Sequence, residues 1–222
     1  LENSCIRFAG ERALGFVGEE DISYGELKRQ VDELSAFLQD QGIRHGDRVA
    51  ILGENSPQWA IAYYAVTSIG SVAVPILPEF HTSEIHHILR HSEARALFVS
   101  ERYYHRVEDL DFTSFAFVSL LDTFSVIDTD LTKAAIRRLI AEGSRELRRI
   151  RNIARRLVGL IPTEVKPDDA AAIIYTSGTT GHSKGVMLSH RNIACNASAG
   201  AIIQPLSPED RTLSILPLAH VY

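Results

Sequence analysis

Cysteine is scarce in this 222-residue chain, which contains only Cys5 and Cys195. Two cysteines cannot build a disulfide framework, so we expect a reducing compartment and a cytoplasmic location. No apolar run approaches the roughly 20 residues that a membrane-spanning helix requires. Basic residues are outnumbered, with 23 Lys and Arg against 28 Asp and Glu. This mild acidity argues against nucleic acid as the main partner.

The composition otherwise fits a soluble globular protein, with 45% hydrophobic and 23% charged residues. The length suffices for one large domain or two small ones, with room to bury a core. The chain does not begin with methionine, and residues 1–4 do not resemble a signal peptide. We therefore expect a chain trimmed from a longer protein.

Short apolar segments alternate with helical patterns along the chain. Strands are predicted over residues 13–17, 48–52, 72–76, 95–99, 115–120, 170–175, 186–188 and 212–216. Helices are predicted to begin at Ser23, where Glu26 completes a capping-box pattern, at Ser56-Pro57, at Thr82 and at Ser189. This alternation predicts an α/β fold of mainly parallel sheets flanked by helices.

The segment 131–161 differs from its surroundings because it carries nine basic and two acidic residues. An apolar stripe at helical spacing runs through its second half, from Leu147 to Ile161. We favour a solvated helix packed on its own domain, or a partly ordered insertion. The alternative is a basic amphipathic helix that makes peripheral contact with the inner face of an anionic membrane.

The most informative segment is Tyr175-Thr-Ser-Gly-Thr-Thr-Gly-His-Ser-Lys-Gly185, which follows an apolar strand. Its glycines permit positive φ angles and close backbone approach, so successive N–H groups can form an anion-binding concavity. The hydroxyls add neutral donors, and Lys184 adds a mobile positive charge. Convergent donors of this kind suit a polyphosphate, whose several negative charges leave water on binding.

Two other nucleotide-binding motifs are excluded at this loop. A Walker A motif needs Ser or Thr directly after its lysine, whereas here Ser183 precedes Lys184 and Gly185 follows it. A dinucleotide fingerprint is excluded because Gly-x-Gly-x-x-Gly is absent from the loop. A plain polar surface turn is disfavoured, because consistent chemistry extends through the whole loop behind a strand.

Residues 175–185 closely resemble the phosphate-binding signature of the AMP-forming adenylating superfamily, which includes acyl-CoA synthetases, adenylation domains of peptide synthetases and luciferases. Further segments extend the resemblance over nearly the whole chain: Ile22-Ser-Tyr-Gly-Glu-Leu27, Gly46-Asp-Arg-Val-Ala50, Asn55-Ser-Pro57, Gly70-Ser-Val-Ala-Val-Pro75 and Gly185-Val-Met-Leu-Ser-His-Arg-Asn192. The last motif, Leu216-Pro-Leu-Ala-His-Val-Tyr222, looks like the form typical of long-chain fatty acyl-CoA synthetases.

The resemblance implies that residues 1–222 are part of the large N-terminal AMP-binding domain of an adenylate-forming enzyme. Within it we expect a first α/β region at 1–130, a basic helical insertion at 131–163 and a phosphate-loop region at 164–222. The family's magnesium-binding glutamate, its adenine and ribose contacts and its catalytic lysine would all lie beyond Tyr222. We therefore expect that this chain alone is inactive.

The resemblance also implies a reaction with ATP, Mg²⁺ and coenzyme A. The carboxylate of a fatty acid would attack the α-phosphorus of ATP, and the thiol of coenzyme A would then displace AMP from the acyl-adenylate. His220 matches a position beside the acyl pocket that responds to the switch between these half-reactions, with a purely structural histidine as the alternative. Thr176 would also help to place Mg²⁺. The β- and γ-phosphates would be held by Thr176, Ser177, Gly178, Thr179, Thr180, Gly181 and Lys184.

Ser183 departs from the family pattern, because proline usually precedes the loop lysine. Proline would stiffen the turn and remove a donor, so serine predicts a looser loop.

Fatty acid activation with small-molecule partners is the leading functional prediction. The alternatives are an adenylation domain for an amino or aryl acid and a non-catalytic nucleotide-binding protein. His87 and His91 have a spacing that could share a metal, but a polar helix face is favoured because no third ligand is evident.

Overall fold

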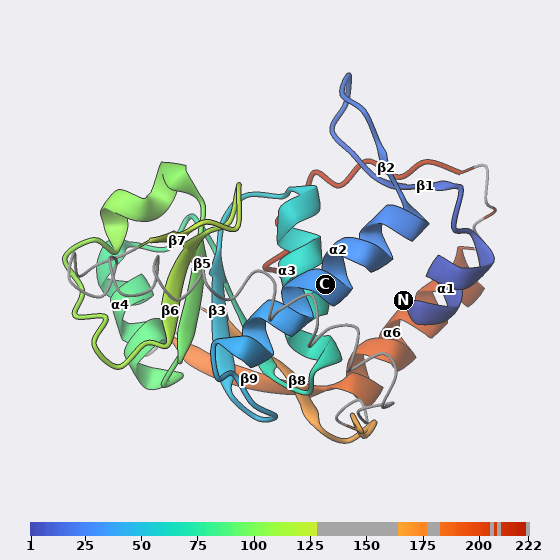
Figure 1. Ribbon diagram of the computed structural model, residues 1–222. Coiled ribbons are helices and arrows are strands. Elements are labelled where there is room, and N and C mark those ends of the chain that lie inside the picture. Colours follow the sequence, from blue (N-terminus) through green and yellow to red (C-terminus); the bar gives the residue numbers. More distant parts are fainter. Residues whose placement is uncertain (128–163, 177–182, 205–206, 208–209, 221–222) are drawn as a thin grey trace.

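The computed structural model describes residues 1–127, 164–176, 183–204, 207 and 210–220 (Figure 1). Its helices are α1 (Glu2–Arg7), α2 (Tyr24–Asp40), α3 (Pro57–Ser68), α4 (Thr82–His91), the 3₁₀ helix η1 (Glu101–Arg106) and α6 (His190–Ile203). Its strands are β1 (Arg12–Leu14), β2 (Ile22–Ser23), β3 (Arg48–Leu52), β4 (Val72–Ile76), β5 (Ala96–Val99), β6 (Phe117–Leu120), β7 (Val126–Ile127), β8 (Ala170–Thr176) and β9 (Lys184–Ser189).

Seven strands form one sheet in the order β7-β6-β5-β3-β4-β8-β9. The five central strands are parallel to one another, and the edge strands β7 and β9 pair antiparallel with their neighbours. Strands β1 and β2 form a separate antiparallel pair, which projects from the main body in Figure 1. The prediction of a mainly parallel sheet flanked by helices is therefore confirmed.

Helices cover both faces of the sheet, as a parallel sheet requires. Alternate residues of β3 enter different cores, because successive side chains of a strand point to opposite faces. Val49 and Ile51 belong to the core that contains α2 and α3, whereas Ala50 and Leu52 belong to the core beneath α4. The central strands are thus buried on both sides.

Local capping explains where the first long helices begin. Ser23 Oγ accepts a hydrogen bond from the Glu26 N–H at 3.1 Å, and Ser56 Oγ accepts one from Trp59 N–H at 3.0 Å. The predicted starts of α2 and α3 are therefore confirmed. The Glu26 carboxylate accepts hydrogen bonds from Arg29 instead of bonding back to the Ser23 backbone. These hydrogen bonds, together with one from the Gln30 side-chain amide, lower the pKa of Glu26 to about 2.

One predicted strand is wrong, because residues 212–216 form no strand within the described segment 210–220. A strand needs the backbone of a neighbour to pair with. Here the backbone is held by a side chain instead, since Asn55 Nδ2 donates to the carbonyls of Ser214 and Leu216. The predicted basic helix at 131–163 lies outside the described residues. Among the described helices, none has both the length and the apolar character needed to cross a membrane.

Candidate functional site

The candidate phosphate loop connects β8 to β9, and the two strands hold its ends side by side. Tyr175 pairs with Gly185, and the last pair before the loop is Thr176 with Lys184. The side chains of Thr176 and Lys184 are both exposed. The structure therefore brings these two predicted residues together. The other five predicted donors, Ser177, Gly178, Thr179, Thr180 and Gly181, lie outside the described residues.

The hairpin places the two ends of this loop at the carboxyl edge of the parallel strands. Strand β8 pairs in parallel with β4, with Ala172 opposite Ala73, so Thr176 lies at the same edge as the end of β4. Strand β3, in turn, neighbours β4. In open α/β sheets, ligands bind outside the carboxyl ends of the strands. Thr176 and Lys184, the two ends of the loop, thus lie at the edge where sheets of this kind bind ligands.

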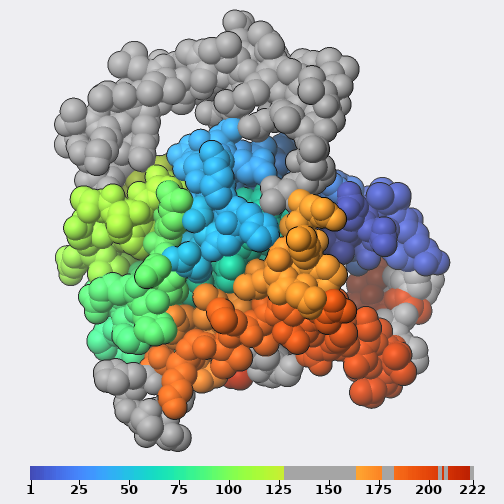
Figure 2. Space-filling model, turned by 90° about the horizontal axis from the view of Figure 1, so that it is seen from below, coloured from blue at the N-terminus to red at the C-terminus, as the bar shows by residue number. Residues whose placement is uncertain are grey.

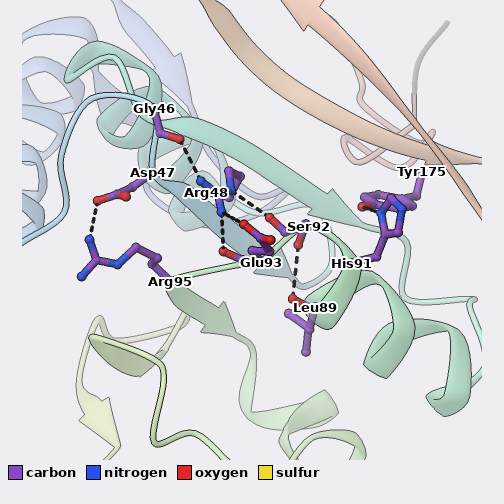
Figure 3. Close-up of polar contacts among 9 residues, drawn as sticks. All are labelled: Gly46, Asp47, Arg48, Leu89, His91, Ser92, Glu93, Arg95 and Tyr175. Atoms are coloured by element: carbon purple, nitrogen blue, oxygen red, sulfur yellow. Dashed lines mark hydrogen bonds and ion pairs between the residues drawn. The ribbon is translucent and has the colours of Figure 1, made fainter.

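Tyr175 anchors the base of the loop. Its side chain is 3% exposed, and burial raises the pKa of its hydroxyl. A Cβ atom added to Gly185 would lie 2.9 Å from Ile173 Cγ2 and 3.2 Å from Tyr175 Cζ, so glycine lets the ring close over the opposite strand. The Tyr175 hydroxyl forms a 2.7 Å hydrogen bond with Nδ1 of His91 (Figure 3). The end of α4 is therefore joined directly to the root of the loop.

A second contact holds the same end of α4 against the central sheet (Figure 3). Arg48, the first residue of β3, donates from Nε to the Ser92 carbonyl at 2.8 Å and from Nη2 to the Glu93 carbonyl at 3.1 Å. Its Nη2 also forms a 2.7 Å ion pair with the Glu93 carboxylate. Sequence reasoning missed these roles, because His91 meets a tyrosine 84 positions away and a single sequence carries no signal of that pairing.

Polar contacts join the start of β8 to the start of α6. Arg191 forms a two-pronged ion pair with Asp168, at 2.7 Å and 3.0 Å, and this contact lowers the pKa of the Asp168 carboxyl. Asp169 forms a 3.0 Å contact with Nε2 of His45, and its carbonyl accepts from the His190 N–H at 3.1 Å. Burial of the imidazole lowers the pKa of His190. These contacts close the hairpin at the end opposite the loop.

Ser183 occupies the position where the resemblance leads one to expect proline. Its side chain is buried, at 8% exposure, and its Oγ has no hydrogen-bond partner in the part of the chain that the structure describes. A buried hydroxyl without a partner is uncommon in folded proteins. The root of the loop therefore holds an unused donor next to Lys184.

His220 lies in a turn that is tied to the end of β3. Its backbone N–H donates to the Pro217 carbonyl at 2.9 Å, and its side chain is exposed. Asn55, which follows β3, hydrogen-bonds the backbone on both sides of Pro217. Because neighbouring strands lie about 4.8 Å apart, the ends of β3 and β8 are separated by roughly 10 Å along this edge. The fold thus brings the His220 turn and the phosphate loop to one edge of the sheet.

The chain matches the family of AMP-binding enzymes over residues 1–222, and it belongs to this family. A long-chain-fatty-acid–CoA ligase of Escherichia coli O6:H1 is 29% identical over 239 residues, a match that covers 100% of this chain and 42% of the relative. An indoleacetate–CoA ligase of Aromatoleum aromaticum is 31% identical over 212 residues, covering 96% of this chain and 38% of the relative. This chain therefore spans less than half the length of these relatives.

Solved structures show the same fold. The N-terminal domain of FACL13 from Mycobacterium tuberculosis, in an inhibitor-bound crystal structure, matches with a TM-score of 0.76 at 23% identity. The match covers 99% of this chain and 50% of that one. Fold and family thus agree with the resemblance that the loop sequence suggested.

Proposed function

We propose that this chain forms the phosphate-binding part of an enzyme that activates a fatty acid through an acyl-adenylate to acyl-CoA. The observation that carries the proposal is the β8–β9 hairpin, which sets Thr176 beside Lys184 at the carboxyl edge of the sheet. Family membership and the long-chain ligase relatives support it. The proposed substrates are ATP, a fatty acid and coenzyme A.

In the proposed first step, a carboxylate oxygen of the acid forms a bond to the α-phosphorus of ATP. The bond between the α-phosphorus and the bridging oxygen breaks, and pyrophosphate leaves with that oxygen. The nucleophile is already an anion, so no base is required and catalysis rests on positioning and charge neutralisation. Lys184 would neutralise charge on the β- and γ-phosphates. Thr176, Ser177, Gly178, Thr179, Thr180 and Gly181 would donate to their oxygens.

Mg²⁺ fits this proposal as an ion held chiefly by the nucleotide. Among the described residues, no cluster of three His, Cys, Asp or Glu side chains could hold a metal. Magnesium commonly keeps several waters and binds substrate phosphates with few protein ligands. The exposed Thr176 hydroxyl, at the end of β8, supplies one suitable oxygen. When bound, the ion would neutralise phosphate charge and orient the polyphosphate.

In the second step, the thiol sulfur of coenzyme A attacks the acyl carbon, and AMP leaves as the carbon–oxygen bond breaks. His220 would lie beside the acyl group, at the edge that also carries the phosphate loop.

An aryl acid is the second candidate substrate, because an indoleacetate–CoA ligase is 31% identical to this chain. An aliphatic preference would favour the first candidate.

Pyrophosphate exchange by the protein made from its complete reading frame tests the proposal. Exchange should depend on a fatty acid and respond to chain length across a series of acids. Lys184→Ala should lower exchange at least tenfold, since a charge-assisted contact to phosphate is lost. Lys166→Ala, which removes an exposed charge before β8, is the matched control and should leave exchange unchanged. A complete failure of exchange with every carboxylic acid tested would contradict the proposal. Exchange with aryl acids alone would favour the second candidate.

We propose, in addition, that residues 1–222 alone form no acyl-adenylate. The relatives are more than twice as long as this chain, and the resemblance places the remaining substrate contacts outside it. Pyrophosphate exchange assayed on the 222-residue chain should give no signal above background. Exchange by the isolated chain would contradict this part of the proposal.

Peripheral contact with a membrane is a further proposal, and it rests on the basic sequence of 131–161 alone. The proposed cytoplasmic location rests separately on the scarcity of cysteine. Cosedimentation with liposomes tests the contact. Binding to anionic vesicles but not to neutral ones would support it. Equal binding to both kinds of vesicle, or binding to neither, would contradict it.

A further inference from the structure

Asn55 makes four hydrogen bonds to a segment that lies about 160 positions further along the chain. Its Nδ2 donates to the Leu216 carbonyl at 2.7 Å, to the Ser214 carbonyl at 3.3 Å and to Ser214 Oγ at 3.2 Å. Its Oδ1 accepts from the Leu218 N–H at 2.7 Å. Both the nitrogen and the oxygen of the Asn55 side-chain amide are therefore hydrogen-bonded to this segment.

The two shortest of these bonds lie on either side of Pro217. Proline has no N–H, and the Pro217 carbonyl already accepts from the His220 N–H, so the Leu216 carbonyl and the Leu218 N–H are the adjacent backbone groups left for a partner. The Asn55 amide presents one donor and one acceptor in the matching arrangement. The side chain thus takes the place that a neighbouring strand would fill, which explains why residues 212–216 do not join the sheet.

The same turn is fixed at a second point by burial. Ala219 is 3% exposed and belongs to the core cluster that contains Trp59 of α3. The Asn55 bonds before it and the buried Ala219 side chain together determine the path of the turn. His220, the next residue, has its side chain exposed at the carboxyl edge of the sheet. Its position is therefore set by contacts made elsewhere in the turn.

We propose that Asn55 is a positioning residue for the His220 turn, and that it controls binding of the carboxylic acid more than binding of ATP. The inference rests on the proposed function, in which His220 lies beside the acyl group. The four side-chain hydrogen bonds of Asn55 go to residues 214–218, whereas the root of the phosphate loop is held separately, at Tyr175 and Gly185. Loss of the Asn55 amide should move the acid site and leave the ATP site in place.

Two variants separate the effect from simple destabilisation. Asn55→Asp keeps the acceptor for the Leu218 N–H but places a carboxylate oxygen against the Leu216 carbonyl. Ser56→Ala is the matched control, because it removes the helix cap on Trp59 N–H at the same corner and touches no residue of 214–218. Both changes are small in volume, and both affect the junction between β3 and α3.

The first measurement is amide hydrogen exchange on the 222-residue chain. Asn55→Asp should speed exchange across residues 214–218 about fivefold or more, since a net hydrogen bond is lost there. Ser56→Ala should speed exchange in the first turn of α3 and leave 214–218 unchanged. Unchanged exchange at 214–218 in Asn55→Asp would overturn the positioning role, whatever the protein catalyses.

The second measurement is pyrophosphate exchange by the protein made from its complete reading frame. Asn55→Asp should raise KM for the acid at least fivefold and change KM for ATP less than twofold, whereas Ser56→Ala should change neither. Equal effects of Asn55→Asp on both KM values would overturn the inference. A wild-type protein that shows no exchange with any acid would refute the proposed function instead, and the amide measurement would still decide the role of Asn55.

Discussion

The parallel centre of the sheet and the β8–β9–α6 region differ sharply in burial. All five residues of β4 and all four of β5 are buried. In contrast, the first four residues of β9 are exposed, and α6 buries none of its 14 residues. In Figure 2 the orange and red residues of this second region lie together along one side of the visible face. The exposed large apolar side chains of this region are Val186, Met187, Ile202 and Ile203, and the segment after α6 adds Leu213, Ile215, Leu216 and Leu218.

The difference shows that local signals and burial are separate determinants of structure. Helix α6 has a complete capping box, in which Ser189 Oγ accepts from the Asn192 N–H and the Asn192 side chain accepts from the Ser189 N–H. Its first turn is therefore fixed although none of its residues is buried. Helices α2 and α3 combine caps with burial against the sheet. The two regions should consequently respond very differently to mutation.

The largest expected difference comes from removing one large side chain in each region. Phe98 of β5 is fully buried, so Phe98→Ala should lower the free energy of unfolding by about 3–5 kcal/mol. Ile203 of α6 is 84% exposed, so Ile203→Ala should change it by no more than about 0.5 kcal/mol. Urea unfolding of both variants measures this. A similar loss in both would mean that α6 is packed in solution.

A glycine pair sharpens the comparison within the second region. Gly185→Ala forces Ile173 and Tyr175 to move, and should destabilise the protein by about 1–3 kcal/mol. Gly200 of α6 has nothing within 4 Å of its added Cβ, so Gly200→Ala should stabilise it by about 0.5–1 kcal/mol through helix propensity. Thermal unfolding gives the sign of each effect. Destabilisation by Gly200→Ala would show that the helix has a partner there.

The contact between the regions can be measured directly. Tyr175→Phe removes the hydroxyl that bonds His91, and His91→Ala removes the other partner. A double-mutant cycle should give a coupling free energy of about 1 kcal/mol. The variant that lacks both groups should then be less destabilised than the two single effects added together. Simple additivity would mean that the hydrogen bond contributes nothing to stability.

The smallest expected effect is a dependence of stability on pH at the start of α6. Burial lowers the pKa of His190, so below its ordinary value near 6.5 the unfolded chain binds a proton that the folded chain does not. Stability should therefore fall as pH decreases from 6.5 toward the folded pKa. His190→Gln should flatten this slope, and NMR titration of the imidazole should give a pKa below 6.5. A pKa at or above 6.5 would contradict the assignment.

The sequence predicted those elements whose causes are local. Helix α4 begins at Thr82 as predicted, and Arg48–Leu52 and Val72–Ile76 are strands as expected. Their signals are caps, periodicity and apolar runs of residues close in sequence. The strand predicted at 212–216 is wrong because the backbone there is held by one side chain, that of Asn55, more than 150 positions earlier.

The position of the candidate site between two strands was predictable from the sequence, whereas the contacts that anchor it were not. The strand-to-loop pattern placed Thr176 and Lys184 at one turn, because a glycine-rich segment directly follows a strand. The anchoring residues were not predictable. His91, Gly185 and Asn55 act through residues far away or on the opposite strand, and their types are compatible with many unrelated roles.

Pairing of β8 with β4 has a consequence for how the protein is made. Ala172 lies beside Ala73, although roughly one hundred residues separate them in the chain, and such distant contacts form slowly during folding. The ribosome completes β3, β4, β5 and β6 before it synthesises β8. Until then β4 has an open edge with unpaired backbone groups. A nascent chain paused in this interval is exposed to aggregation until β8 closes that edge.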